Sequence, residues 1–176
     1  MSRFDECLAH VLKSEGGYAD HPADKGGATN FGITQATYDE FHTVQGAMPK
    51  SVEYIALPEV AAIYKSMYWD ACRCGDMRPP LDLAVFDAAV QHGPKRAARW
   101  LQNMVCATPD GIIGEQTLCA VNNHLLRYTL HAMVDAYQRY RATYYAAIIA
   151  RDPTQKVFER GWRNRMASLN HLLEVA

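Results

Sequence analysis

Residues 81–91 constrain the fold most strongly, because they form a helical stretch that is apolar on nearly every side. The stretch reads LDLAVFDAAVQ and is interrupted only by Asp82, Asp87 and its closing residue, Gln91. A helix of this kind is stable only when it is buried, so we expect it to be the central helix of the fold. A buried acid needs a partner. Asp87 is therefore expected to pair with a lysine or arginine or, together with Gln91 and His92, to reach a cleft.

Helical periodicity surrounds this stretch on both sides. Apolar spacing predicts a helix near the start of the chain and further helices over residues 35–41, from Pro58, over 94–105, over 125–149 and after Asp152-Pro153. Several of these stretches begin with the capping residue or the proline that helix starts favour. Only residues 31–33 suggest a strand, so a small hairpin is the most β structure that we expect. The pattern predicts a mainly α fold.

The overall charge and the cysteine count limit the possible function classes. The 176 residues carry a formal net charge of −1, so no global field draws the chain to nucleic acid. The N-terminus has no apolar run after a basic start, so we expect no secretory signal, and no apolar stretch is long enough to predict a membrane span. Five cysteines without such a signal favour free thiols made in a reducing cytoplasm. We expect a monomer.

Residues 15–34 are the first place to look for a functional site. They contain five glycines, arranged in two Gly-Gly pairs and one single residue, and three carboxylates. Glycine permits backbone conformations and close approaches that other residues resist, so this segment makes a poor helix and a poor strand. It suits a turn-rich loop that carries polar side chains into a cleft. We expect it to form a small irregular or hairpin lobe.

Glu15 begins this segment and lies on the apolar face of the preceding helix, with Leu8, Val11 and Leu12. The Gly-Gly pair that follows is expected to end the helix. Partial burial and the negative end of the helix dipole both favour the protonated form of the carboxyl, which is the form that a general acid needs. The alternative interpretation is a solvated glutamate at the end of a helix.

Asp20 and Asp24 follow in the same loop among polar or small residues, where both carboxylates should stay ionised. A protonated acid beside an ionised carboxylate is the pairing that glycoside hydrolysis requires. Turn formation and metal binding are the alternatives, although the segment does not have the calcium-loop pattern. Tyr68 and Trp69 are further candidates, because aromatic rings stack on the apolar faces of sugars. Core packing is the alternative for both rings.

The motif that begins at Glu15 is similar to a known family signature. The matching residues are Glu15-Gly-Gly-Tyr18, Asp20, Pro22, Asp24, Gly26-Gly27, Thr29-Asn30 and Gly32-Ile33-Thr34. Together they resemble glycoside hydrolase family 108, whose members are bacterial and phage N-acetylmuramidases, some described as secretion activators. The resemblance implies a lysozyme-like helical fold, peptidoglycan glycan strands as the substrate, no metal and no organic cofactor.

The resemblance also implies roles for single residues. Glu15 matches the family's catalytic acid, which protonates the β-1,4 bond between N-acetylmuramic acid and N-acetylglucosamine. The order Glu15, Asp24, Thr29 is similar to the glutamate, aspartate and threonine of phage-type lysozymes, with Thr29 holding the attacking water. The spacing from Asp24 to Thr29 is one residue shorter than in that pattern, so Asp20 remains an alternative second carboxylate. Further substrate contacts are expected from Tyr18, Asn30, Tyr68, Trp69 and Gln91.

The second half of the chain resembles a wall-binding module. Leu101-Gln102, Asp110-Gly111-Ile-Ile-Gly114 and Thr117-Leu118 are similar to the pattern of small helical peptidoglycan-binding modules. We therefore divide the chain into a catalytic region over residues 1–91 and a predicted peptidoglycan-binding region over residues 92–176, packed as one compact unit. The alternative for the second region is a structural lobe that completes the core.

Two other functions are compatible with the sequence. One is a lytic transglycosylase, which needs the acid but no carboxylate that positions water. The other is a non-catalytic wall-binding or secretion-assisting protein. Without a secretory signal, we expect the chain to be made in the bacterial cytoplasm and to reach the wall through a holin, another release route or lysis, as phage endolysins do.

Overall fold

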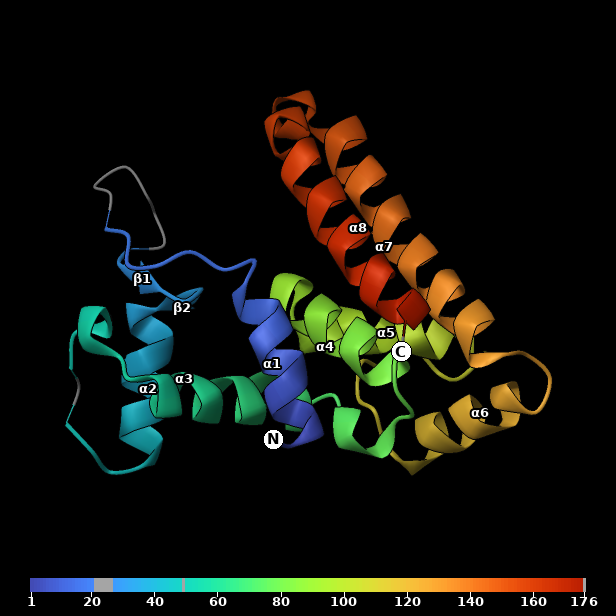
Figure 1. Cartoon of the computed structure of the whole chain (residues 1–176), viewed down its shortest axis with the longest axis horizontal. Coiled ribbons are helices and arrows are strands. Elements are labelled where there is room, and N and C mark those ends of the chain that lie inside the picture. Colours follow the sequence, from blue (N-terminus) through green and yellow to red (C-terminus); the bar gives the residue numbers. More distant parts are fainter. Residues whose placement is uncertain (21–26, 49, 176) are drawn as a thin grey trace. The chain divides into compact units, whose positions relative to one another are not determined.

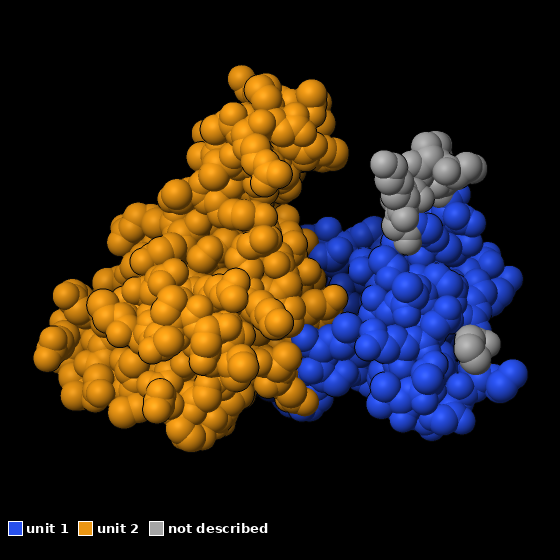
Figure 2. Space-filling view, turned by 180° about the vertical axis from the view of Figure 1, so that it is seen from behind, with its two compact units in different colours: residues 1–67 blue, residues 68–176 orange. Residues whose placement is uncertain are grey.

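The computed structural model describes residues 1–20, 27–48 and 50–175 and divides the chain into two compact units. Unit 1 is Met1–Met67 and unit 2 is Tyr68–Ala176, coloured blue and orange in Figure 2. Each unit is built mainly from helices, and within the described residues only unit 1 holds β structure (Figure 1).

Unit 1 contains three α-helices and one hairpin in its described residues. The elements are α1 (Arg3–Leu12), β1 (Thr29–Asn30), β2 (Ile33–Thr34), α2 (Gln35–Val44), a 3-10 turn (Val52–Tyr54) and α3 (Leu57–Tyr64). Thr34 caps α2, because its hydroxyl accepts a hydrogen bond from the backbone N–H of Thr37 at 3.2 Å. Pro58 lies in the first turn of α3. The helix starts predicted at Thr34 and Pro58 are confirmed.

The hairpin of unit 1 is as small as the sequence suggests. β1 and β2 are antiparallel, with Thr29 opposite Thr34 and Asn30 opposite Ile33. The turn between them consists of Phe31 and Gly32, whose φ angles are 50° and 70°. A positive φ at both central residues gives a tight turn whose twist matches that of the strands. Glycine adopts this backbone without strain, whereas Phe31 needs neighbours that hold it there.

All the regular elements of unit 2 in its described residues are helices, joined by loops. A π-helical segment (Lys65–Asp70) leads from unit 1 into unit 2. A 3-10 turn (Cys74–Asp76), α4 (Leu81–His92), α5 (Pro94–Met104), α6 (Glu115–Leu125), α7 (Leu130–Arg151), a second 3-10 turn (Pro153–Phe158) and α8 (Glu159–Val175) follow. α7 and α8 pack side by side and run in opposite directions (Figure 1).

α4 is the buried centre of unit 2, as its apolar sequence predicts. Every residue from 81 to 89 is buried, and α4 packs against both α5 and α7. Asp87 is fully buried and forms ion pairs with Arg141 of α7 at 2.5 Å and with Arg165 of α8 at 3.0 Å. Burial alone would raise the pKa of Asp87, but the two guanidinium groups hold it below its ordinary value. The expectation that Asp87 pairs with an arginine is confirmed.

Two helix boundaries differ from the sequence prediction. The helix expected over residues 125–149 is interrupted, because the hydroxyl of Thr129 accepts from the N–H of Ala132 and starts α7 at Leu130. α1 ends at Leu12, three residues before Glu15. The predicted class, a mainly α fold with a small hairpin lobe, is confirmed. In the described parts of the chain, no helix combines the length and the apolar character that crossing a lipid bilayer requires.

Candidate active site

Glu15 lies in a tight turn that follows α1. The backbone N–H groups of residues 13, 14 and 15 donate to carbonyls three positions earlier, at 3.2, 3.0 and 3.3 Å. This tighter winding ends the α-helix. Gly16 and Gly17 are not among the glycines with a positive φ, so the prediction that this pair ends the helix is wrong. The side chain of Glu15 is half-buried, next to exposed backbone at both glycines.

The turn of the hairpin forms one wall of the space around the Glu15 carboxyl. A Cβ atom on Gly32 would lie 2.6 Å from Oε2 of Glu15 and 3.1 Å from the hydroxyl oxygen of Tyr64. The first distance is too short for a methyl group and the second is tight, and the φ of Gly32 is 70°. A glycine is therefore needed at position 32 for two reasons: the backbone conformation of the turn and the close approach of the Glu15 carboxyl.

Tyr64, the last residue of α3, holds this turn in position. Its ring is buried, and its hydroxyl donates a hydrogen bond of 2.7 Å to the carbonyl oxygen of Phe31. On the other side, the N–H of Phe31 donates to the carbonyl of Gly16 at 3.1 Å. These two bonds fix Phe31 at its positive φ. They also fix the backbone that follows Glu15 against the hairpin.

Tyr18 and Asp20 flank a further contact between the loop and the hairpin. Ala19, which lies between them, pairs with Thr29 through two backbone hydrogen bonds of 2.8 Å. Tyr18 and Asp20 are both exposed. Partial desolvation, followed by the nearby carboxylates of Asp20 and Glu53, raises the pKa of Tyr18. Because its pKa is raised, the hydroxyl of Tyr18 keeps its proton and can donate a hydrogen bond near these carboxylates.

Thr29 and Asn30 form β1 but differ in their surroundings. Thr29 is half-buried, and its hydroxyl is not hydrogen-bonded to any residue in the described part of the chain. Asn30 is buried, and its Nδ2 donates to the carbonyls of Val52 and Glu53 at 3.2 and 3.1 Å. Asn30 ties the hairpin to the 3-10 turn, and its contact with a glycan stays a prediction. Asp24 lies outside the described residues. The described site residues of unit 1 all gather around one hairpin.

Tyr68, Trp69 and Gln91 belong to unit 2. Trp69 is buried and packs edge-to-face on Phe86, with ring centroids 5.3 Å apart. Gln91 accepts hydrogen bonds from Arg141 and from a tyrosine hydroxyl of α7. Tyr68 is half-buried. Core packing accounts for Trp69, and Gln91 links α4 to α7, so a substrate contact by these residues stays a prediction.

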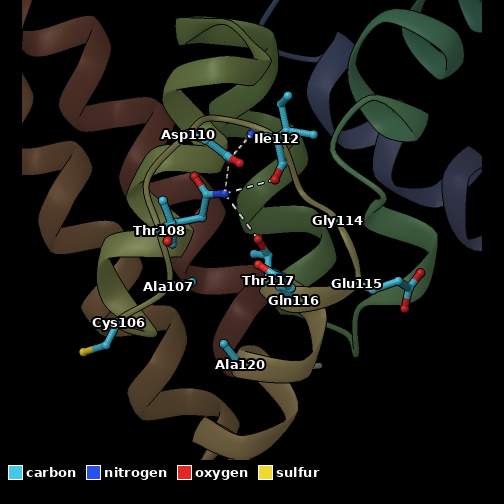
Figure 3. A pocket seen from close by; sticks show the side chains of 11 residues that line it. Cys106, Ala107, Thr108, Asp110, Ile112, Gly114, Glu115, Gln116, Thr117 and Ala120 are labelled. Carbon is cyan, nitrogen blue, oxygen red and sulfur yellow. Dashed lines mark hydrogen bonds between the residues drawn. The ribbon is translucent and has the colours of Figure 1, made fainter.

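The second sequence motif surrounds a hollow of about 400 Å³ between α5 and α6 (Figure 3). Gln102 of α5 is the buried centre of this motif. Its Nε2 donates to Oδ1 of Asp110 at 2.7 Å, to the carbonyl of Ile112 at 3.0 Å and to the hydroxyl of Thr117 at 3.2 Å. Its Oε1 accepts from the N–H of Gly111 at 2.9 Å. The motif therefore holds the loop between two helices in place.

Comparisons with known proteins match both parts of the chain. The family model of glycosyl hydrolase 108 covers residues 8–93, and that of the predicted peptidoglycan domain covers residues 96–167. The solved structure of SagA from Brucella abortus is similar, with 31% sequence identity, a TM-score of 0.79, and coverage of 98% of this chain and 94% of that chain. The chain belongs to the glycosyl hydrolase 108 family. Among curated proteins, no match is found.

Membership of the glycosyl hydrolase 108 family makes the chain a glycoside hydrolase. The accompanying peptidoglycan domain supports peptidoglycan as its substrate and partner. The first match contains the hairpin lobe with Glu15, and the second contains the motif around Gln102. The sequence resemblance that begins at Glu15 is therefore confirmed at the level of the family.

The sequence pattern does not reveal Tyr64 as part of the candidate site. Its place in the apolar stripe of α3 predicts only core packing. Its hydroxyl nevertheless holds the turn that faces Glu15. The available signal is the hydroxyl itself, because a buried tyrosine needs a hydrogen-bond partner, whereas a phenylalanine would not.

Proposed function

We propose that this family member is a lysozyme, an N-acetylmuramidase that hydrolyses the β-1,4 bond between N-acetylmuramic acid and N-acetylglucosamine, with Glu15 as the general acid. The observation that carries the proposal is the position of the Glu15 carboxyl against Gly32, in a space that no larger residue would leave open. The Glu15 side chain is half-buried, and the exposed residues beside it leave room for a glycan strand.

The proposed reaction needs one proton donor and one carboxylate. Glu15 gives its proton to the glycosidic oxygen as the bond from that oxygen to C1 of N-acetylmuramic acid breaks, and the next sugar leaves as an alcohol. The positive charge that develops on the ring is stabilised by Asp20 or Asp24. Thr29 holds the water that adds to C1, and its hydroxyl is available for this within the described residues.

The two regions divide the work in this proposal. The region over residues 1–91 carries out the hydrolysis, and the region over residues 92–176 holds the wall polymer. The substrate lies outside the cytoplasm, so the enzyme reaches the cell wall or periplasm after release from the cytoplasm in which it was made, through a holin, another route or lysis. This release step is part of the proposal.

The proposal is tested by digesting purified peptidoglycan and analysing the fragments by mass spectrometry. Wild-type chain should release fragments that end in reducing N-acetylmuramic acid. Glu15→Gln should release them more slowly by a factor on the order of 10² to 10⁴, since general acid catalysis contributes about that much. Glu40→Gln, an exposed change on α2 with the same effect on net charge, is the matched control and should retain the wild-type rate.

Two results would replace the proposal with one of its alternatives. Anhydro-muramyl ends, together with full activity of Asp20→Ala and Asp24→Ala, would establish a lytic transglycosylase. Undiminished biological activity of Glu15→Gln, with no fragments released by the wild-type chain, would establish a wall-binding or secretion-assisting protein.

A further inference from the structure

A basic hollow opens in unit 2 at the start of α5. Its volume is about 770 Å³, and its lining includes three exposed cations, Lys95, Arg96 and Arg99, beside the rings of His92 and Trp100. The sequence from residue 92 to residue 104 contains no acid. The first residues of α5 also line the hollow, so the positive end of the helix dipole adds to its potential.

The three cations are available for a ligand. Within the part of the chain that the structure describes, none of them is paired with a carboxylate. Arg96 is positioned by a ring instead, because its guanidinium lies 4.4 Å from the centroid of Tyr144. Arg96 and Arg99 are three residues apart and share one exposed face of α5. Arg99 interacts with the carboxylate of Asp110 only over a longer distance. The hollow thus holds several cations that form no direct ion pair with a carboxylate in the described part of the chain.

A second hollow adjoins the first across Trp100. It has a volume of about 480 Å³ and is lined mainly by α7, including Tyr140 and Tyr144. Trp100 lines both hollows, and Arg96 of the first covers Tyr144 of the second. The two hollows share Trp100; the first presents the three cations, and the second presents tyrosine rings beside Arg139. We call the two hollows together the α5–α7 trough, defined by Lys95, Arg96, Arg99, Trp100, Tyr140 and Tyr144.

We propose that the α5–α7 trough binds the stem peptides of peptidoglycan together with the sugar that carries them. The cations hold peptide carboxylates, and the tyrosine rings lie against the apolar face of the sugar. Arginine suits this task, because its planar head group binds a carboxylate through two parallel hydrogen bonds. This inference rests on the proposed function and adds to it the part of the polymer that unit 2 recognises.

The charge of the whole chain favours this ligand over nucleic acid. The formal net charge is −1, so the cations of the trough are a local feature and no positive field extends over the whole chain. Nucleic acid carries a charge at every phosphate and is bound by long tracts of cations. A stem peptide carries its few carboxylates within a short span next to an uncharged sugar, and the trough presents cations and rings in that same order.

The test measures binding of the full chain carrying Glu15→Gln, which leaves the polymer intact, to purified peptidoglycan. Neutralising the three cations of the trough should weaken binding by about tenfold, since exposed charge contacts are individually weak. Neutralising three other exposed cations of unit 2 changes the net charge equally and should alter binding less than about twofold. The trough variant is Lys95→Gln, Arg96→Gln, Arg99→Gln, and the control variant is Arg127→Gln, Lys156→Gln, Arg160→Gln.

A second arm uses glycan strands from which an amidase has removed the stem peptides. The trough variant and the control variant should differ less on these strands than on intact polymer, and both should bind weakly, because the peptide carboxylates are gone and only the lactyl carboxylate that the amidase leaves on each N-acetylmuramic acid remains. The proposal is overturned if the trough variant binds intact peptidoglycan as the control does, if peptide-free strands bind as tightly as intact polymer, or if duplex DNA binds more tightly than either. Failure of the proposed function is visible separately, as fragments released by the Glu15→Gln chain or as none released by the wild-type chain.

Discussion

The two units use most of their motif residues in different ways. In unit 1, backbone hydrogen bonds and the buried side chains of Asn30 and Tyr64 make the connections, whereas the side chains of the loop from Glu15 to Asp20 stay half-buried or exposed. In unit 2, the side chain of Gln102 makes the connections and is almost completely buried. A motif that matches a family therefore does not by itself say that its residues touch a ligand. Exposure and internal hydrogen bonds decide between recognition and scaffolding.

The largest expected effect concerns the buried charges that hold unit 2 together. Asp87→Ala leaves Arg141 and Arg165 without their counter-charge and should lower the free energy of unfolding by about 3–5 kcal/mol. The pKa of Asp87 is lowered in the folded chain, so its contribution is present above the unfolded value of 3.8 and is lost as the pH falls through the folded pKa. Urea unfolding checks this loss.

Asp76→Ala is the matched control for Asp87. Asp76 also pairs with an arginine, Arg73 at 2.7 Å, but its side chain is 51% exposed. An exposed pair contributes at most about 1 kcal/mol. If Asp87→Ala and Asp76→Ala lowered the free energy of unfolding equally, the importance of buried charge in unit 2 would be contradicted.

The next effect concerns the turn that faces Glu15. Gly32→Ala would push a methyl group into the carboxyl of Glu15 and should reduce the rate of peptidoglycan hydrolysis by about 100-fold, the cost of roughly 1 Å of misplacement. Gly46→Ala is the control, since Gly46 also has a positive φ, 67°, but has nothing within 4 Å of the added atom. Both variants should lose stability to a similar extent. Activity lost equally in both would refute the contact with Glu15.

A smaller effect tests whether the motif of unit 2 is scaffolding. Gln102→Leu leaves the N–H of Gly111 and the polar groups around it without partners and should cost about 1–3 kcal/mol of unfolding free energy. Gln116→Leu, an exposed change in the lining of the same hollow, should stay within about 0.5 kcal/mol. If Gln102→Leu weakened peptidoglycan binding and left stability unchanged, Gln102 would be a recognition residue.

The smallest effect, taken per pH unit, concerns the response of unit 2 to acid. Burial, followed by Arg141 and Arg96, lowers the pKa of His92 from 6.5 to about 3. Over this pH range His92 binds a proton in the unfolded chain but not in the folded chain. Stability therefore falls as the pH drops from about 6.5 towards 3. His92→Phe keeps a ring against Trp100 and should reduce this decline by at most about 1.4 kcal/mol per pH unit. Unfolding curves at several pH values measure the slope, and an unchanged slope would contradict the account.

Local sequence patterns predict much of the architecture. The burial of α4, the need of Asp87 for a cationic partner and the cap at Thr34 all follow from residue type and spacing. The end of α1 does not, because the Gly-Gly pair is a strong stop signal, whereas the chain leaves the helix one turn earlier through short-range hydrogen bonds. The carbonyl of Gly16 then accepts from the N–H of Phe31, a contact between distant segments that the local pattern does not contain.

The candidate site is only partly predictable for the same reason. Glu15, Tyr18 and Asp20 stand out because they are polar residues in a glycine-rich loop, which suits a cleft better than a helix or a strand. Tyr64 does not stand out, since its hydrogen bond to Phe31 joins segments that are distant in sequence. The scaffolding use of Gln102 is hidden too, because a sequence match carries no information about burial.

The central claim is that the proton on Glu15 drives hydrolysis while other residues hold the polymer. The most direct measurement follows bound chain and newly formed reducing ends in the same peptidoglycan suspension, for wild type and Glu15→Gln. The account predicts an unchanged bound fraction at the first time point and a release rate lower by a factor on the order of 10² to 10⁴. A Glu15→Gln chain that binds and releases reducing ends within a few-fold of the wild-type rate would contradict it.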